Sequence, residues 1–306
     1  MSRPGASICG ILLLDKPAGL SSNASLQRVR RLLGAGKAGH VGSLDPLATG
    51  MLPICLGEAT KVAGEILAGR KRYRFTIGLG SRTATGDTEG AVVATAPVPA
   101  LDLAGIDAVL RSFLGSRSQV PPMYSAIKRE GQPLYKLARA GIEVQREPRN
   151  IELFELPRLA FDGSSLELEA LCSKGTYIRT LAEDISAALG TCGHVSSLRR
   201  LFVEPFEREA METLETITAA CAAGETDLLP RARLRILPAD APLRHLPAVS
   251  LDEKATSRML HGQPVALSET ATEGTVRLYD GSGTFLGLGH ADGHGTVRAR
   301  RLFVRV

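Results

Sequence analysis

The chain has 306 residues, of which 44% are hydrophobic and 23% charged, which suits one sizeable core with a small additional module and excludes a disordered chain. Its five cysteines are scattered without a Cys-x-x-Cys pair, which excludes a disulfide framework and the usual zinc sites. The formal net charge of +5 favours an anionic partner, although many proteins without one are equally basic.

The N-terminal segment predicts a strand followed by a helix. The apolar run Cys9–Leu14 is too short to span a membrane and ends at a Lys16-Pro17 turn, so we expect a buried strand. Apolar residues recur at helical spacing from Leu26 to Leu33, with Ser21 or Ser22 as the N-cap. No targeting segment is visible, which predicts a cytoplasmic protein without a membrane anchor.

The segment Gly39–Lys61, GHVGSLDPLATGMLPICLGEATK, holds one lone acid, Asp45, among glycines, prolines and apolar residues. A carboxylate at the edge of a core is costly to bury unpaired, so we expect a partner cation from elsewhere in the chain. An Asp before a Pro is also a common turn residue, and the pattern by itself leaves that structural role open.

The next segment alternates strand and loop signals. Lys71–Gly80 places apolar side chains, Tyr73 among them, at every second position, which predicts a half-buried strand. We expect residues 81–90 to form a solvated polar loop, because Asp87 and Glu89 lack the further spacing of a metal site. A short helix is expected over Ile106–Phe113.

Aromatic and basic residues are interleaved from Gln119 to Arg139, with Lys128 among the basic ones. Rings stack on bases and cations meet phosphates, so this mixture suits contact with a nucleic acid. A charged surface hairpin followed by a helix would explain the same residues.

A second candidate charged residue lies near the middle of the chain. Leu166–Cys172 alternates as a strand, and a helix over Tyr177–Leu189 follows it, with Thr176 as the cap. Arg179 falls in the first turn, where the helix dipole disfavours a cation, so an acidic partner or a surface position must explain it. The next segment, Gly193–Arg200, is predicted to be a short loop.

The rest of the chain predicts helix, boundary and β structure in turn. Residues 207–238 look helical, and residues 238–247 contain three prolines, which indicates a boundary. Residues 248–306 predict a helix over Asp252–Leu260 and several short strands broken by glycines.

Several stretches together resemble the TruB family, the bacterial tRNA pseudouridine-55 synthases: Gly39–Lys61, the PPMYSAIK run at 121–128, CSKGTYIRTL at 172–181 and LRR at 198–200. The resemblance implies an α+β fold with two domains. Residues 1–245 would form the catalytic domain around a mostly antiparallel mixed sheet, with a tRNA-gripping insertion at about 119–150. Residues 246–306 would form a small C-terminal β-barrel RNA-binding domain of the PUA type.

The resemblance also implies roles for single residues. Asp45 matches the catalytic aspartate of the family, and Arg179 matches the arginine that pairs with it. Tyr73 matches the tyrosine that stacks on the flipped base, and His40 matches the histidine that fills the vacated space. The remaining matches are expected to bind RNA or support the base pocket: Lys16, Lys128, Tyr177 and Leu198.

The expected reaction isomerises the T-loop uridine of tRNA to pseudouridine without a metal or cofactor. Uracil leaves C1′, turns and is rejoined through C5, after the base has been extruded from its stack. The sequence leaves open whether Asp45 attacks C1′ or C6 or removes a proton at C2′. We expect a monomer bound to the T stem-loop. A guide-RNA-dependent subunit of the archaeal or eukaryotic type and a non-catalytic RNA-binding protein are the two alternatives.

Overall fold

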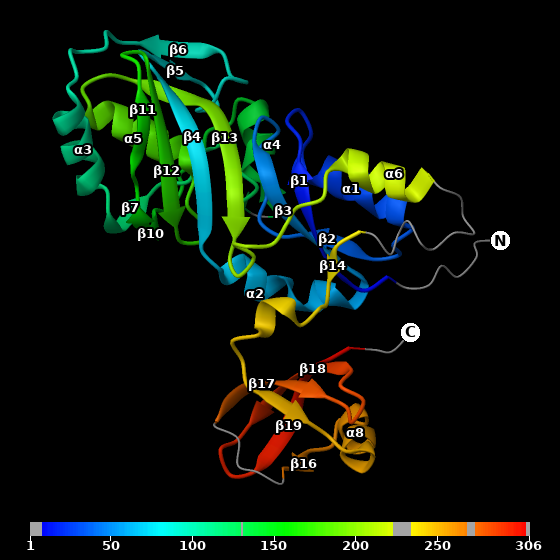
Figure 1. Cartoon of the computed structure of the whole chain (residues 1–306). Helices are drawn as coiled ribbons and strands as arrows, with labels where there is room; N and C mark the ends of the chain where they lie inside the picture. The colour runs from blue at the N-terminus through cyan, green and yellow to red at the C-terminus, as the bar shows by residue number, and fades with distance from the viewer. Residues whose placement is uncertain (1–7, 130, 223–233, 268–272, 304–306) are drawn as a thin grey trace.

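The computed structural model describes residues 8–129, 131–222, 234–267 and 273–303. The chain forms a ten-stranded sheet flanked by helices and a separate five-stranded sheet near the C-terminus (Figure 1). This is a mixed α+β architecture, as the sequence predicts. Within the described ranges, every helix is too short or too polar to cross a membrane.

The large sheet is almost entirely antiparallel. In spatial order its main strands are β14 (Ile236–Leu237), β1 (Gly10–Lys16), β3 (Thr49–Leu56), β13 (Gly193–Val203), β4 (Lys71–Leu79), β12 (Ser165–Cys172), β10 (Arg149–Glu155) and β7 (Gly115–Gln119). In addition, β2 (Ala38–His40) pairs with β3, and β11 (Arg158–Phe161) pairs with β12.

One parallel contact joins the two halves of this sheet. Strands β3 and β13 run parallel over two residue pairs, with Arg199 opposite Thr49 and Arg200 opposite Gly50. The loop that carries Asp45 connects β2 to β3 and therefore enters the sheet at this central seam. The sheet topology thus places Asp45 at the middle of the large sheet.

Helices and hairpins surround the large sheet. They are α1 (Ser22–Leu33), η1 (Gly57–Val62), α2 (Ala63–Ala68), the β5–β6 hairpin (Ser81–Thr83 and Val92–Thr95), α3 (Leu103–Ser112), the β8–β9 hairpin (Lys128–Arg129 and Gln132–Pro133), α4 (Leu134–Arg139), α5 (Ile178–Ala188), α6 (Leu214–Ala222) and η2 (Ala241–Leu243). Helices α1 and α6 pack against each other beside β1, and α5 packs along β13 (Figure 1).

Strand β1 is buried on both of its faces, which explains why its sequence is a continuous apolar run. Leu12 and Leu14 belong to the core cluster shared with α1, α5 and β4. Ile11 and Leu13 point to the other side, into a second cluster with α2. This burial on both sides fixes the strand that leads directly to Lys16.

The C-terminal part is a curled, open sheet with one helix against it. Its strands, in spatial order, are β15 (Ala248–Ser250), β17 (Gly274–Tyr279), β18 (Phe285–Ala291), β19 (Thr296–Leu302) and β16 (Val265–Ala266), and its helix is α8 (Glu253–Leu260). Among the described residues β15 and β16 are free edges, so the expected barrel is a half-barrel. The division of the chain at residue 245 stays a prediction.

The small sheet is attached to the rest of the chain by both apolar and polar contacts. Leu288 and Phe303 belong to the same buried cluster as Ile11 and Leu13 of β1. Lys61 Nζ donates to the carbonyl of Leu302 at 2.7 Å. Removing this part of the chain would therefore expose core residues of the large sheet.

Several local predictions need correction. Gly193–Arg200, expected as a loop, lies in strand β13, because a bulge between Val195 and Ser197 hides the strand alternation. Thr176 does not cap α5, since its hydroxyl donates instead to the carbonyl of Ser173. The helix expected over 207–238 is found only at Leu214–Ala222, and residues 223–233 lie outside the described residues.

Candidate active site

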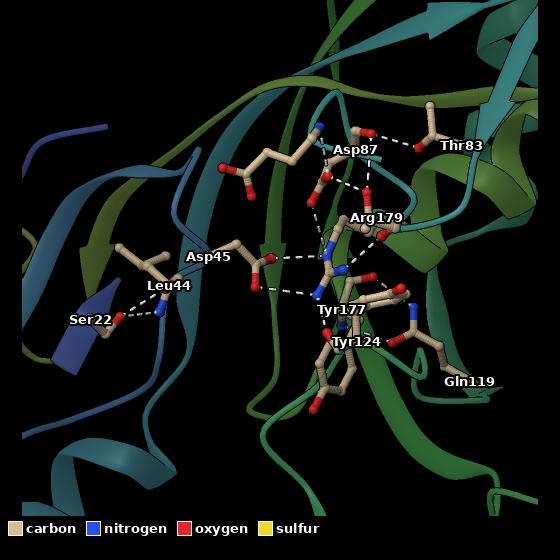
Figure 2. Close-up of polar contacts among 11 residues, drawn as sticks. Ser22, Leu44, Asp45, Thr83, Asp87, Gln119, Tyr124, Tyr177 and Arg179 are labelled. Carbon is tan, nitrogen blue, oxygen red and sulfur yellow. Dashed lines mark hydrogen bonds and ion pairs between the residues drawn. The ribbon is translucent and has the colours of Figure 1, made fainter. Parts of the chain in front are cut away.

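Asp45 sits on a loop that is tied down at the two residues next to it. The hydroxyl of Ser22 donates to the carbonyl of Leu44 at 2.8 Å and accepts from its N–H at 2.7 Å (Figure 2). On the other side, the buried Lys16 ammonium donates to the carbonyl of Pro46 at 3.2 Å. Because Ser21 is the N-cap of α1, the hydroxyl of Ser22 is available to bind the backbone of Leu44.

Arg179 grips the Asp45 carboxylate with two nitrogens. Its Nε lies 2.9 Å from Oδ2 and its Nη2 donates to Oδ1 at 3.2 Å (Figure 2). The Arg179 side chain is 4% exposed, whereas that of Asp45 is 36% exposed. The cation is thus sealed inside the protein while the carboxylate keeps an open side for another molecule. A fork of this kind fixes the orientation of a carboxylate and favours its ionised form.

The remaining donors of Arg179 are held by backbone carbonyls from two distant segments. Nη1 donates to the carbonyl of Thr85 at 2.7 Å, and Nη2 donates to the carbonyl of Tyr124 at 2.6 Å. Tyr124 belongs to the segment predicted to grip RNA, and Thr85 belongs to the loop predicted to be solvated. Arg179 therefore connects the Asp45 loop to both of these segments.

Asp87 corrects the prediction for the 81–90 loop. Its side chain is only 3% exposed, and its Oδ2 lies 3.8 Å from Arg179 Nε. The hydroxyl of Thr85 and the N–H of Glu89 both donate to its Oδ1 (Figure 2). The hydroxyl of Thr83 donates to its backbone carbonyl at 2.6 Å. Thr83 and Thr85 were the signal, since Thr85 supplies a donor that the buried carboxylate needs and Thr83 holds the backbone of the same residue.

A second missed residue is Gln119 at the end of β7. It is 4% exposed, and its side-chain amide donates to the carbonyl of Tyr177 at 3.1 Å and accepts from the N–H of Tyr177 at 2.8 Å. No side chain caps α5, so this amide satisfies the backbone at the start of the helix. Gln119 thereby fixes the turn from which Arg179 projects.

Opposing effects act on the pKa of Asp45. Burial raises this pKa above its usual value, and the charge of Asp87 acts in the same direction. The charge and hydrogen bond of Arg179 and the charge of Lys16 lower it, although the net direction is upward. Burial also lowers the pKa of Lys16 to about 8, against the attraction of Asp45.

The other predicted site residues lie at different distances from this ion pair. Tyr73 and Leu198 are buried in the core beside Asp45's loop, with Leu198 opposite Phe75 on the neighbouring strand. Burial raises the pKa of Tyr73 and of Tyr177, and the charge of Asp45 contributes to both shifts. His40, at the end of β2, has a buried Nδ1 without a hydrogen-bond partner. Lys128 is exposed on β8.

Comparison with known proteins identifies the family. Residues 30–178 match the model for the N-terminal domain of TruB family pseudouridylate synthases. Residues 179–244 match the model for the C-terminal domain of tRNA pseudouridylate synthase B, and residues 247–303 match that for the C-terminal part of pseudouridine synthase II TruB. The chain is 47% identical over 302 residues to tRNA pseudouridine synthase B of Stutzerimonas stutzeri, which covers 99% of this chain and 98% of that protein. The chain belongs to the TruB family of pseudouridylate synthases.

A further relative agrees with membership of the TruB family, and two solved structures share the fold. The tRNA pseudouridine synthase B of Yersinia pestis (strain Pestoides F) is 48% identical over 311 residues, which cover 99% of this chain and 96% of that protein. A Cbf5-Nop10-Gar1 complex contains a chain with a TM-score of 0.70 and 25% identity, covering 97% of this chain and 84% of that one. An archaeal box H/ACA Nop10-Cbf5 complex gives a TM-score of 0.68 at 24% identity, over 93% and 79% of the two chains, and shows a shared fold.

Proposed function

We propose that this chain isomerises uridine 55 in the T loop of tRNA to pseudouridine, with Asp45 as the reacting carboxylate. The observation that carries the proposal is the asymmetry of the ion pair, in which Arg179 is sealed and Asp45 is open on one side. Relatives that share 47–48% of the sequence are named tRNA pseudouridine synthase B, which supports tRNA as the substrate.

The reaction needs a carboxylate that stays ionised next to the ribose and uracil. The C1′–N1 bond breaks, the base rotates, C1′–C5 forms, and the proton on C5 is lost. Asp45 either forms a bond to C1′ or C6 or takes the proton from C2′, and both routes use its anionic form. Arg179 supports that form because a neighbouring cation lowers the pKa of a carboxylate.

Binding of the RNA is assigned to residues around this carboxylate. Tyr73 would stack on the extruded base with Tyr177 and Leu198 around it, and His40 would fill the space left in the T loop. Lys16 supports the loop, and the exposed Lys128 on the insertion would meet a phosphate. We place the activity in the cytoplasm, where tRNA is modified, and expect the chain to act as a monomer.

The proposal is tested with a tRNA transcript that carries tritium at C5 of uridine. Each isomerisation releases one tritium to water, because C5 exchanges its hydrogen for a bond to C1′. We expect release from the wild-type transcript and none from a transcript with cytidine at position 55. If the folded enzyme binds the transcript without releasing tritium, the proposal is wrong. A guide-dependent subunit or a non-catalytic RNA-binding protein would then be favoured. Equal release from both transcripts would refute the choice of position 55.

Gln119→Leu is expected to slow isomerisation more than it weakens RNA binding. The substitution leaves the N–H of Tyr177 unpaired, whereas the Tyr177 carbonyl still accepts from the N–H of Leu181. An unpaired buried group costs about 1–3 kcal/mol of stability, and the loss loosens the start of α5. Tritium release and thermal unfolding measure both effects. Gln119→Glu, which keeps the acceptor and loses the donor, should fall between wild type and Gln119→Leu. A Gln119→Leu variant with wild-type rate and stability would contradict this role.

The C-terminal sheet is expected to contribute affinity rather than rate. Deleting it would expose the core cluster around Ile11, so surface substitutions are the sharper test. Arg298 and Arg300 are both exposed on β19, with Arg300 at the bulge opposite Leu288 and Gly289. Replacing both by Ala should weaken tRNA binding and lower its salt dependence by about one unit for each lost phosphate contact. The rate at saturating RNA should not change, and Arg111→Ala, on the exposed face of α3, is the control. A lower saturated rate would contradict the assignment.

A further inference from the structure

Arg200 is a charged side chain that the proposed chemistry does not use, yet it is among the most deeply buried in the protein. It is 1% exposed and follows Arg199 on β13, at the central seam of the large sheet. Among the described residues no carboxylate lies within ion-pair distance of Arg200, in contrast to Arg199, which pairs with Asp15. A buried cation without an acid is costly, so its retention calls for a specific task.

The guanidinium of Arg200 holds the Asp45 loop at both of its ends. Nε donates to the carbonyl of Met51 at 2.7 Å, and Nη2 donates to the carbonyl of Gly42 at 2.8 Å. Gly42 precedes Asp45 by three residues and Met51 follows it by six. The other contacts that hold the loop, from Ser22 and Lys16, are made to the residues next to Asp45.

We call the two hydrogen bonds from Arg200 to Gly42 and Met51 the clasp. It requires glycine at two positions of the loop. Gly50 has a φ of +98°, and a Cβ built on it would lie 2.1 Å from the carbonyl oxygen of Arg200. Gly42 has a φ of +70°, and its Cβ would lie 3.2 Å from Nη1 of the Arg200 guanidinium. Both ends of the loop thus pack directly on Arg200, one on its backbone and one on its side chain.

The charge of Arg200 also reaches the base pocket. It lowers the pKa of His40, after the larger effect of burial, and it opposes the increase that burial imposes on the pKa of Tyr73. Tyr73 is the direct neighbour of Arg200 across the β4–β13 ladder. The clasp therefore lies between the loop that carries Asp45 and the strand that carries Tyr73.

We propose that Arg200 is a positioning residue that sets the distance of Asp45 from the bound uridine by clasping both ends of the Asp45 loop. This inference rests on the proposed function. Arg is needed because its planar fork reaches two carbonyls at once, whereas a lysine ammonium is a single point of charge. The side chain of Arg200 is covered and therefore does not contact the substrate, so its effect on Asp45 passes through the loop that it holds.

The test compares Arg200→Lys with Arg199→Lys, a matched change one residue away. Single-turnover tritium release with excess enzyme gives the rate, and filter binding gives the Kd for tRNA. Arg200→Lys keeps the charge and loses one of the two carbonyl contacts, so we expect an unchanged Kd and a rate about a hundredfold lower, the cost of a small misplacement of a catalytic group. Arg199→Lys should keep the wild-type rate.

A third variant separates positioning from a general loss of stability. Leu110→Ala truncates a buried side chain in α3, on the far half of the large sheet, and is assayed at the temperature where its folded fraction equals that of Arg200→Lys. Retention of the wild-type rate by Leu110→Ala supports positioning. An equal rate loss in the two variants, or a wild-type rate in Arg200→Lys, overturns the proposal. Absence of tritium release by the wild type would instead refute the proposed function.

Discussion

Asp45→Asn is expected to abolish pseudouridine formation while leaving tRNA affinity close to that of the wild type. The change removes the negative charge and the nucleophilic or basic oxygen but almost none of the shape. Asn still offers one oxygen to the Arg179 guanidinium, whose other donors remain on the carbonyls of Thr85 and Tyr124. We expect the rate to fall by about 10⁴-fold or more, as for the loss of a reacting group in other enzymes.

The measurement for Asp45→Asn is tritium release together with filter binding and thermal unfolding. The control is Asp15→Asn, which removes an acid from the adjoining strand β1. Among the described residues this carboxylate forms an ion pair with Arg199 alone. Asp15→Asn should release tritium at nearly the wild-type rate. Comparable losses of rate and affinity in Asp45→Asn would show that the substitution had damaged the fold, and a rate near wild type would remove Asp45 from the chemistry.

The elements with a clear periodicity could be predicted from the sequence. The apolar run that forms β1, the alternation that forms β4 and the helical face of α1 each reflect one local rule. Ser21, one of the two serines expected as the N-cap, caps α1. Such elements bury a face whose residues are near one another in the chain. Their positions therefore depend little on contacts with distant segments.

The parts that could not be predicted depend on distant contacts. Strand β13 looks like a loop because it contains a glycine, two serines and a bulge, and it is a strand because β3 and β4 lie on either side of it. Asp87 looks solvated because its nearest cation, Arg179, is 92 residues away in the sequence. The pairing of Asp45 with Arg179 was predictable only from the family resemblance, since neither residue carries a local signal for the other.

Arg179→Met is expected to lower the rate at neutral pH by about a thousandfold and to move the acid side of the pH–rate profile to higher pH. Asp45 works as an anion, so activity is lost as the pH falls through its pKa. Burial raises the pKa of Asp45, and Arg179 opposes that increase. Removing Arg179 should therefore raise the pKa of Asp45 further. Part of the lost rate should therefore return as the pH is increased. If Arg179 only oriented the carboxylate, the rate loss would be equal at every pH.

Asp87→Asn is the matched variant, and it should shift the acid side of the pH–rate profile in the opposite direction. The charge of Asp87 raises the pKa of Asp45, so removing that charge should move the acid side of the profile to lower pH. Asn keeps an oxygen for the donors from Thr85 and Glu89, which limits the change to the charge facing Arg179. Opposite shifts in the two variants would mean that the charges of Arg179 and Asp87 together set the protonation of the Asp45 carboxylate. Shifts in the same direction would mean that the pH profile reports another group.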